Sequence, residues 1–150
     1  MALGLNTDQA SGVLPKRMLA PDPLALPLRR DRRGVRAAGT ALLAGGAVRT
    51  WGTNWIGQLG LASTADIGDD ESILSVPPVS LGGAAIQLSA FDYGFCSVLT
   101  PGASGADGYC VKCWGGNGSG QLGQGNTNTL GNGPGEMGDN LPPIDLRSEE

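Results

Sequence analysis

A ten-residue pattern, W-G-x-N-x-x-G-Q-L-G, occurs twice in this chain and constrains its fold more than any other feature. The first copy is WGTNWIGQLG at residues 51–60, and the second is WGGNGSGQLG at 114–123, an offset of 63 residues. Downstream, PPVSL at 77–81 corresponds to PPIDL at 142–146, at an offset of 65. Similarity that extends over most of a unit is an internal repeat, in which each copy builds the same small structure.

Glycine content indicates the class of secondary structure. The chain has 26 glycines among 150 residues, and glycine inside a helix costs roughly 1 kcal/mol relative to alanine. This argues against a helical bundle and favours short strands joined by tight turns. The segments AIQLSAF, FCSVLT and YCVKCWG predict three strands, and a weaker fourth strand is expected after the loop that follows GQLG. We therefore predict an all-β fold with about four short strands per repeat.

The repeat resembles the regulator of chromosome condensation repeat, in the glycine-rich variety common in bacterial repeat proteins. The resemblance rests on the ten-residue motif, preceded by V-R/K-x-W and followed by PP-V/I-x-L, and it covers about residues 37–146. It implies a β-propeller, of seven blades in the family, whose members are mostly interaction modules. Some members exchange nucleotide on a small GTPase, and others inhibit enzymes by plugging them. The histidine usual in the family is replaced by Gly94 and by Ala38.

The resemblance predicts a partial β-propeller of about two four-stranded blades. Blades bury their faces against neighbours, and fewer than about three repeats are rarely stable alone. We expect the chain to be a fragment, a decayed copy or one segment of a larger assembly, which needs further propeller repeats or self-association. The repeats occupy residues 37–150. Residues 1–36, with four prolines and seven of the ten basic residues, are expected to be a disordered or linker segment.

Charge is divided unevenly along the chain. Residues 1–50 carry eight basic and three acidic residues, a net of +5, whereas residues 51–150 carry two basic and eleven acidic residues, a net of −9. An acidic body is unsuited to nucleic acid, which demands a basic surface. Because no apolar run is long enough for a transmembrane helix and no secretory signal is evident, we expect no membrane partner and a cytoplasmic location, with an extracellular location as the alternative.

The motif residues have expected structural roles. The tryptophans end a strand and are expected to wedge between blades. The asparagines suit a turn that needs a side-chain acceptor or a left-handed backbone, and the glutamines are expected to hydrogen-bond buried backbone. The leucines fill the core, and the glycines are expected at turns, at positive φ or in close contacts. These residues are Trp51, Gly52, Asn54, Gly57, Gln58, Leu59 and Gly60 in the first copy, and Trp114, Gly115, Asn117, Gly120, Gln121, Leu122 and Gly123 in the second.

Two of the three cysteines suggest a disulfide. Cys96 and Cys113 match Thr40 and Thr50 in the first copy, so both are absent from that copy together. They lie on adjacent predicted strands, and antiparallel neighbours place some residues within disulfide reach. An oxidising compartment favours a Cys96–Cys113 pair with Cys110 left over, and the equal alternative is three reduced, partly buried thiols.

Sites for cofactors, metals and catalysis are not expected. GSGQLG at 118–123 fits G-x-G-x-x-G, but QGNTNTLGNGPG follows it and cannot form the helix that a nucleotide loop needs. The acidic loop with Asp66, Asp69, Asp70 and Glu71 could bind calcium, but the second copy keeps none of these at matching positions, which favours a solvated loop. With no histidine and no nucleophile in a suitable context, we expect no enzyme, and three cysteines alone are too few for a structural zinc site.

Three functions follow as hypotheses. The first is a non-catalytic protein-interaction module with a protein partner of unknown identity. The second, implied by the family resemblance alone, is a guanine-nucleotide exchange regulator of a small GTPase, and such an analogy from fold to function has little weight. The third is a secreted binder or inhibitor, which a disulfide would support.

Overall fold

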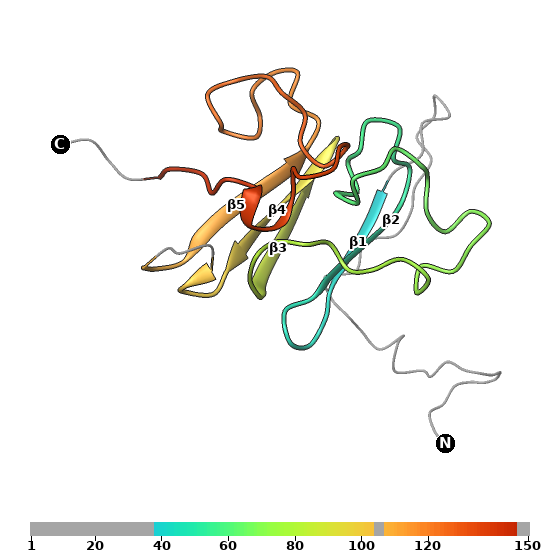
Figure 1. Cartoon of the computed structure of the whole chain (residues 1–150), viewed down its shortest axis with the longest axis horizontal. Coiled ribbons are helices and arrows are strands. Elements are labelled where there is room, and N and C mark those ends of the chain that lie inside the picture. The colour runs from blue at the N-terminus through green and yellow to red at the C-terminus, as the bar shows by residue number, and fades with distance from the viewer. Residues whose placement is uncertain (1–37, 104–106, 147–150) are drawn as a thin grey trace.

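The protein is described by a computed structural model that covers residues 38–103 and 107–146 (Figure 1). Strands β1 (Ala38–Leu42) and β2 (Val48–Gly52) form a two-stranded antiparallel sheet. Strands β3 (Ala85–Phe91), β4 (Gly94–Leu99) and β5 (Cys110–Gly115) form an antiparallel sheet in the order β3-β4-β5. A 3-10 helix, η2 (Gly138–Asn140), follows later in the chain. The described part is all-β, and the linker predicted at 1–36 lies outside it.

The three predicted strands are confirmed to within one residue at their ends. The expected fourth strand of each repeat is wrong, because it is reduced to one isolated antiparallel bridge, Gly52–Ile67 in the first repeat and Gly115–Leu130 in the second. The physical reason is local: φ is 103° at Gly52 and 114° at Gly115, far from strand values. The chain therefore leaves the sheet at these glycines, and pairing does not extend.

The described residues form two units, which we call the first unit (residues 38–81) and the second unit (residues 85–146). Their sheets lie side by side in Figure 1, and the first unit has two strands among its described residues where four were expected. Backbone hydrogen bonds tie the units together at three places. The amides of Ala62, Ala85 and Gly138 donate to the carbonyls of Gly131, Gly46 and Ser80, at 3.0, 2.9 and 2.8 Å.

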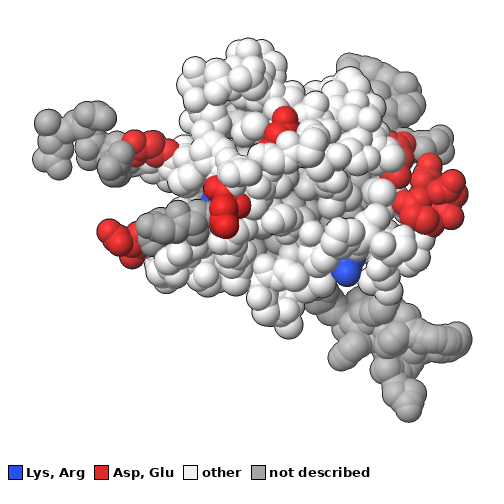
Figure 2. Space-filling model, viewed as in Figure 1, with Lys and Arg blue, Asp and Glu red and all other residues white. Residues whose placement is uncertain are grey.

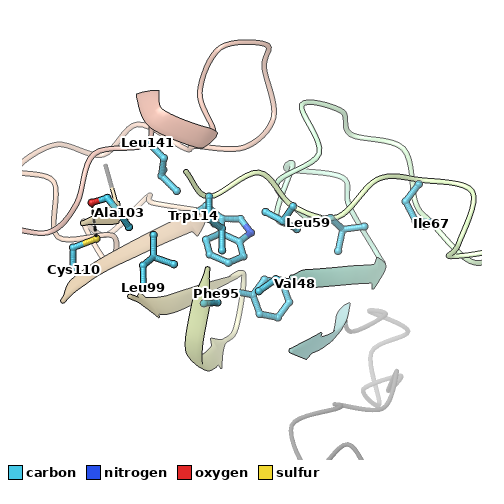
Figure 3. Close-up of a cluster of buried hydrophobic side chains, with 12 residues drawn as sticks. Val48, Leu59, Ile67, Phe95, Leu99, Ala103, Cys110, Trp114 and Leu141 are labelled. Carbon is cyan, nitrogen blue, oxygen red and sulfur yellow. Dashed lines mark hydrogen bonds between the residues drawn. The ribbon is translucent and has the colours of Figure 1, made fainter. Parts of the chain in front are cut away.

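The core lies where the two units meet. Val48 and Leu59 of the first unit and Trp114 of the second are fully buried, and Phe95 is 2% exposed. Figure 3 shows Trp114 at the centre of this cluster with the other three side chains around it, and the Phe95 and Trp114 ring centroids lie 5.9 Å apart. Burying side chains of this size contributes roughly 1.5–3 kcal/mol each, so the contact between the units is a main source of stability.

Candidate functional site

The first motif folds into a turn that a buried asparagine holds. The Asn54 side-chain amide donates to the carbonyls of Ser63 (2.8 Å) and Ala65 (2.9 Å), and its Oδ1 accepts from the Leu59 amide at 2.9 Å. The side chain is fully buried, so these bonds satisfy polar groups that have lost contact with water. One residue thereby ties the motif to the loop that follows it.

The same hydrogen bonds occur around Asn117. Its amide donates to the carbonyls of Asn126 (2.9 Å) and Asn128 (3.0 Å), and its Oδ1 accepts from the Leu122 amide at 2.8 Å. Each of these partners lies 63 residues after its counterpart in the first turn. The two copies of the motif therefore use one hydrogen-bond framework.

The motif glutamines make equivalent bonds in different surroundings. Gln58 Oε1 accepts from the Ile56 amide at 3.1 Å, and Gln121 Oε1 accepts from the Ser119 amide at 2.8 Å. Gln58 is 4% exposed, whereas Gln121 is exposed. The expectation of a buried backbone partner is wrong for Gln121, because the described residues place nothing over the second turn.

The first turn packs directly against the second unit. Gly60 has φ +72°, and a Cβ there would lie 2.7 Å from Cδ1 of the Trp114 indole. A Cβ at Gly57, where φ is +81°, would overlap Asn132. Glycine is needed at both positions, first because the backbone is left-handed and second because the neighbouring unit occupies the space of a side chain.

The second turn has the same backbone but an open side. Gly120 and Gly123 have φ +76° and +68°, and the nearest atoms to a Cβ at these positions would lie at 3.9 Å and 3.4 Å. Both nearest atoms belong to the same unit, in Asn126 and Ile144. The contact that the first unit makes through its turn is thus not made by the second unit within the described chain.

The two motif tryptophans differ in the same way. Trp114 is fully buried against the first unit, whereas Trp51 is only partly buried. The expectation that both wedge between repeats is therefore wrong for Trp51, because the described residues place no further unit on its side.

A disulfide joins Cys96 on β4 to Cys113 on β5. The sulfurs lie 2.01 Å apart and the Cα atoms 4.0 Å apart, and the two residues face each other in the strand pairing. The corresponding facing pair on β1 and β2 is Thr40 and Thr50. Cys110 is a free, buried thiol.

A buried lysine fastens the second unit to the first. Lys112 is fully buried, and its Nζ donates to the carbonyls of Leu81 in the first unit (2.9 Å) and Gly138 in the second (2.8 Å). Desolvation lowers the pKa of Lys112, against the opposing influence of Cys110 and Asp139. Its bonds to backbone carbonyls make it a structural group.

An aromatic pair is exposed where the two units meet. Trp55 is 59% exposed and Tyr93 is 40% exposed, and their rings meet edge to face with centroids 6.1 Å apart. Ile56 lies beside them, since a Cβ at Gly116 would be 2.8 Å from Ile56 Cδ1 and 3.0 Å from Tyr93 Cβ. We call Trp55, Ile56 and Tyr93 the aromatic patch.

The aromatic patch is the strongest candidate for binding, and it was missed in the sequence. Trp55 comes from the first motif turn and Tyr93 from the turn between β3 and β4, so only the fold brings them together. A signal did exist, because Trp55 stands where the second copy has Gly118, an exposed residue with open space around it. The turn therefore forms without an aromatic residue at this position. Large, exposed aromatic rings are enriched among residues that dominate protein–protein binding.

The acidic loop differs from expectation in one respect. Asp69, Asp70 and Glu71 place carboxylate oxygens within 4.8 Å of one another, but Glu71 Oε2 accepts from the Gly68 amide at 2.9 Å. Glu136 makes the same bond to the Gly131 amide at 2.9 Å. The inference that the second copy keeps none of these carboxylates is wrong, because its loop is longer and Glu136 matches Glu71 at an offset of 65. The carboxylate that both loops share closes the loop, which gives it a structural role. Calcium ordinarily takes six to eight oxygen ligands.

The described residues are acidic. They contain two basic residues, Arg49 and Lys112, and nine acidic ones, a net charge of −7. Figure 2 shows acidic side chains at several points of the viewed face and only small basic areas. No helix among the described residues is long and apolar enough to cross a membrane. No family model matches the chain, and no curated protein matches it.

Proposed function

We propose that this chain is a non-catalytic protein-interaction module built on two propeller-type repeats of the regulator-of-chromosome-condensation kind. The observation that carries the proposal is the aromatic patch, in which the rings of Trp55 and Tyr93 contact each other and are nevertheless exposed. The same turn around Asn117 forms with Gly118 in place of Trp55. The tryptophan is therefore not required by the turn, and in this proposal its role is recognition of a partner.

The proposed repeat architecture is supported by the constant spacing of equivalent bonds. Side-chain bonds around Asn54 and Asn117 are offset by 63 residues, and the carboxylate bonds of Glu71 and Glu136 by 65. In this proposal, further propeller repeats or self-association complete the packing that two repeats leave open.

The proposed partner is a protein, recognised through apolar and aromatic contacts. The net charge of −7 over the described residues disfavours nucleic acid as a partner. Nucleic-acid binding is driven by the release of counterions when basic side chains neutralise phosphates. An exposed tryptophan beside a tyrosine suits an apolar side chain or an arginine of the partner, since guanidinium groups stack on aromatic faces. The net negative charge of the described residues favours a partner with a basic surface.

The test is capture of binding proteins from an extract of the source organism, with purified chain as bait. Trp55→Ala is compared with Leu74→Ala, a control because Leu74 is also a large apolar side chain, 72% exposed, and is not part of the aromatic patch. We expect a partner that binds the wild type and Leu74→Ala directly but binds Trp55→Ala at least tenfold more weakly, a loss of about 1.4 kcal/mol. Unchanged binding by Trp55→Ala would contradict the proposal.

A second candidate, a secreted binder or inhibitor, is favoured by the Cys96–Cys113 disulfide. Disulfides persist mainly in oxidising compartments outside the cytosol, so this candidate carries an extracellular location in place of a cytoplasmic one. Mass mapping of the protein from its natural source tests it, because fully reduced Cys96 and Cys113 would remove its support. The exchange-factor alternative rests on the family resemblance and is tested by nucleotide release from small GTPases.

A further inference from the structure

An uncharged hollow lies on the face of the β3-β4-β5 sheet that is turned away from the first unit. Its volume is about 580 Å³, and none of its lining residues is charged. Cys96, Val98 and Val111 line this face from β4 and β5, and Gln87 and Ser89, which pair with Val98 and Cys96, line it from β3. Ile86, Leu88 and Ser97 complete the lining. Because strand residues alternate between faces, this face is opposite to that of Phe95 and Trp114.

The first sheet shows what covers such a face. Thr40 and Val48 hold the positions that Cys96 and Val111 hold in the second sheet. Thr40 is 1% exposed and Val48 is fully buried, and Val48 lies in one hydrophobic cluster with Phe95 and Trp114 of the second unit. Cys96 and Val111 are partly exposed. The chain thus contains one covered copy and one open copy of the same surface.

Part of the surface that covers the first sheet is repeated on the first unit. Trp51 corresponds to Trp114 and is partly exposed. Gly68 corresponds to Gly131, which in the internal contact approaches Gly60 so closely that a Cβ on Gly131 would lie 2.9 Å from the Gly60 Cα. Gly68 is exposed. Trp114 and Gly131 of the covering surface therefore have counterparts of the same residue type on the first unit, whereas Phe95 corresponds to Gly39.

We propose that a second copy of this chain docks head to tail, with its Trp51 side on the hollow. Trp51 of one copy then lies beside Gly123 of the other, as Trp114 lies beside Gly60 within the chain. The two faces differ, so the contact is heterologous and generates a closed ring or an open filament. The inference rests on the proposed function only in requiring self-association, and it uses a surface separate from the aromatic patch.

The test uses glycine-to-asparagine variants of the full chain, because asparagine tolerates positive φ better than other side chains. Gly123→Asn blocks the hollow side, where a Cβ meets only Ile144 at 3.4 Å or more within the chain. Gly68→Asn blocks the opposite side, where a Cβ would lie 3.2 Å from Cγ2 of Ile73. Gly45→Asn is the control, with φ +87° and nothing within 4 Å.

Sedimentation velocity over a range of concentrations measures the assembly. We expect the wild type and Gly45→Asn to associate with rising concentration, and each blocked variant to remain a monomer. An equal mixture of Gly123→Asn and Gly68→Asn is expected to form a species of two chains and nothing larger, since each retains the face that the other lacks. Trp55→Ala is expected to associate like the wild type, so this proposal and the proposed function fail separately.

Three results would overturn the inference. They are a wild type that stays monomeric at every concentration, blocked variants that assemble like the wild type, and a mixture that does not pair. If residues 1–36 cover the hollow of their own chain, the wild type stays monomeric, which is the first of these results. Circular dichroism checks that each variant folds, and if Gly123→Asn does not, Val98→Lys in the hollow takes its place with the same expected result.

Discussion

Replacing Gly60 by alanine tests the contact between the two units, and the chain supplies its own control at Gly123. Both glycines have a left-handed backbone, with φ +72° and +68°, and such a backbone costs an L-residue roughly 1–2 kcal/mol. Only Gly60 also lacks space, because its Cβ would lie 2.7 Å from the Trp114 indole. Overpacking of this kind typically adds about 1–3 kcal/mol.

We therefore expect Gly60→Ala to lower the free energy of unfolding by roughly 2–5 kcal/mol and Gly123→Ala by roughly 1–2 kcal/mol. Urea unfolding followed by tryptophan fluorescence measures both, at a protein concentration where the chain is monomeric. The difference between the two variants reports the contact with Trp114, since the backbone cost is common to both. Equal destabilisation would refute the reasoning, because it would mean that no indole lies against Gly60.

Three further predictions concern stability, each measured by urea unfolding. Asn54→Ala should lower the free energy of unfolding by at least about 2 kcal/mol, because buried backbone groups lose their partners; a neutral effect would contradict the turn framework. Replacing both Cys96 and Cys113 by threonine, as in the first sheet, should cost about 3 kcal/mol for a separation of 17 residues; equal stability with and without the bond would contradict this. Burial lowers the pKa of Lys112 below its usual 10.5, so the unfolded chain binds more protons just below that pH and stability should rise toward pH 10.5; Lys112→Met should remove that rise, and an unchanged profile would contradict the assignment.

The strands and turns were largely predictable because their causes are local. The apolar runs that became β3, β4 and β5 carry their own signal, and the duplicated motif indicated two equivalent turns. The fourth strand failed because its pairing depends on how the chain leaves β2 and β5. Glycines at φ above 100° direct it away from the sheet after a single bridge, and a sequence pattern does not give that direction.

The candidate site was harder to predict because it depends on what lies next to each repeat. Trp51 and Trp114 share one motif position, yet one is partly exposed and the other fully buried. Trp55 and Tyr93 are 38 residues apart and meet only after the units pack. Glu136 was not recognised as the counterpart of Glu71 because the second loop is longer. Each of these features depends on which residues are neighbours in the folded chain, and residue spacing along the sequence does not reveal that.

The packing of the second unit on the first turn is the central claim, and nuclear Overhauser effects to the Trp114 indole test it most directly. We predict strong effects between the Trp114 ring proton at Cδ1 and the Gly60 Hα protons in the monomeric chain, because these groups are in contact. The Gly60→Ala variant should lose or shift them. A Trp114 indole that shows no effects to Gly60 and that exchanges freely with water would contradict the account.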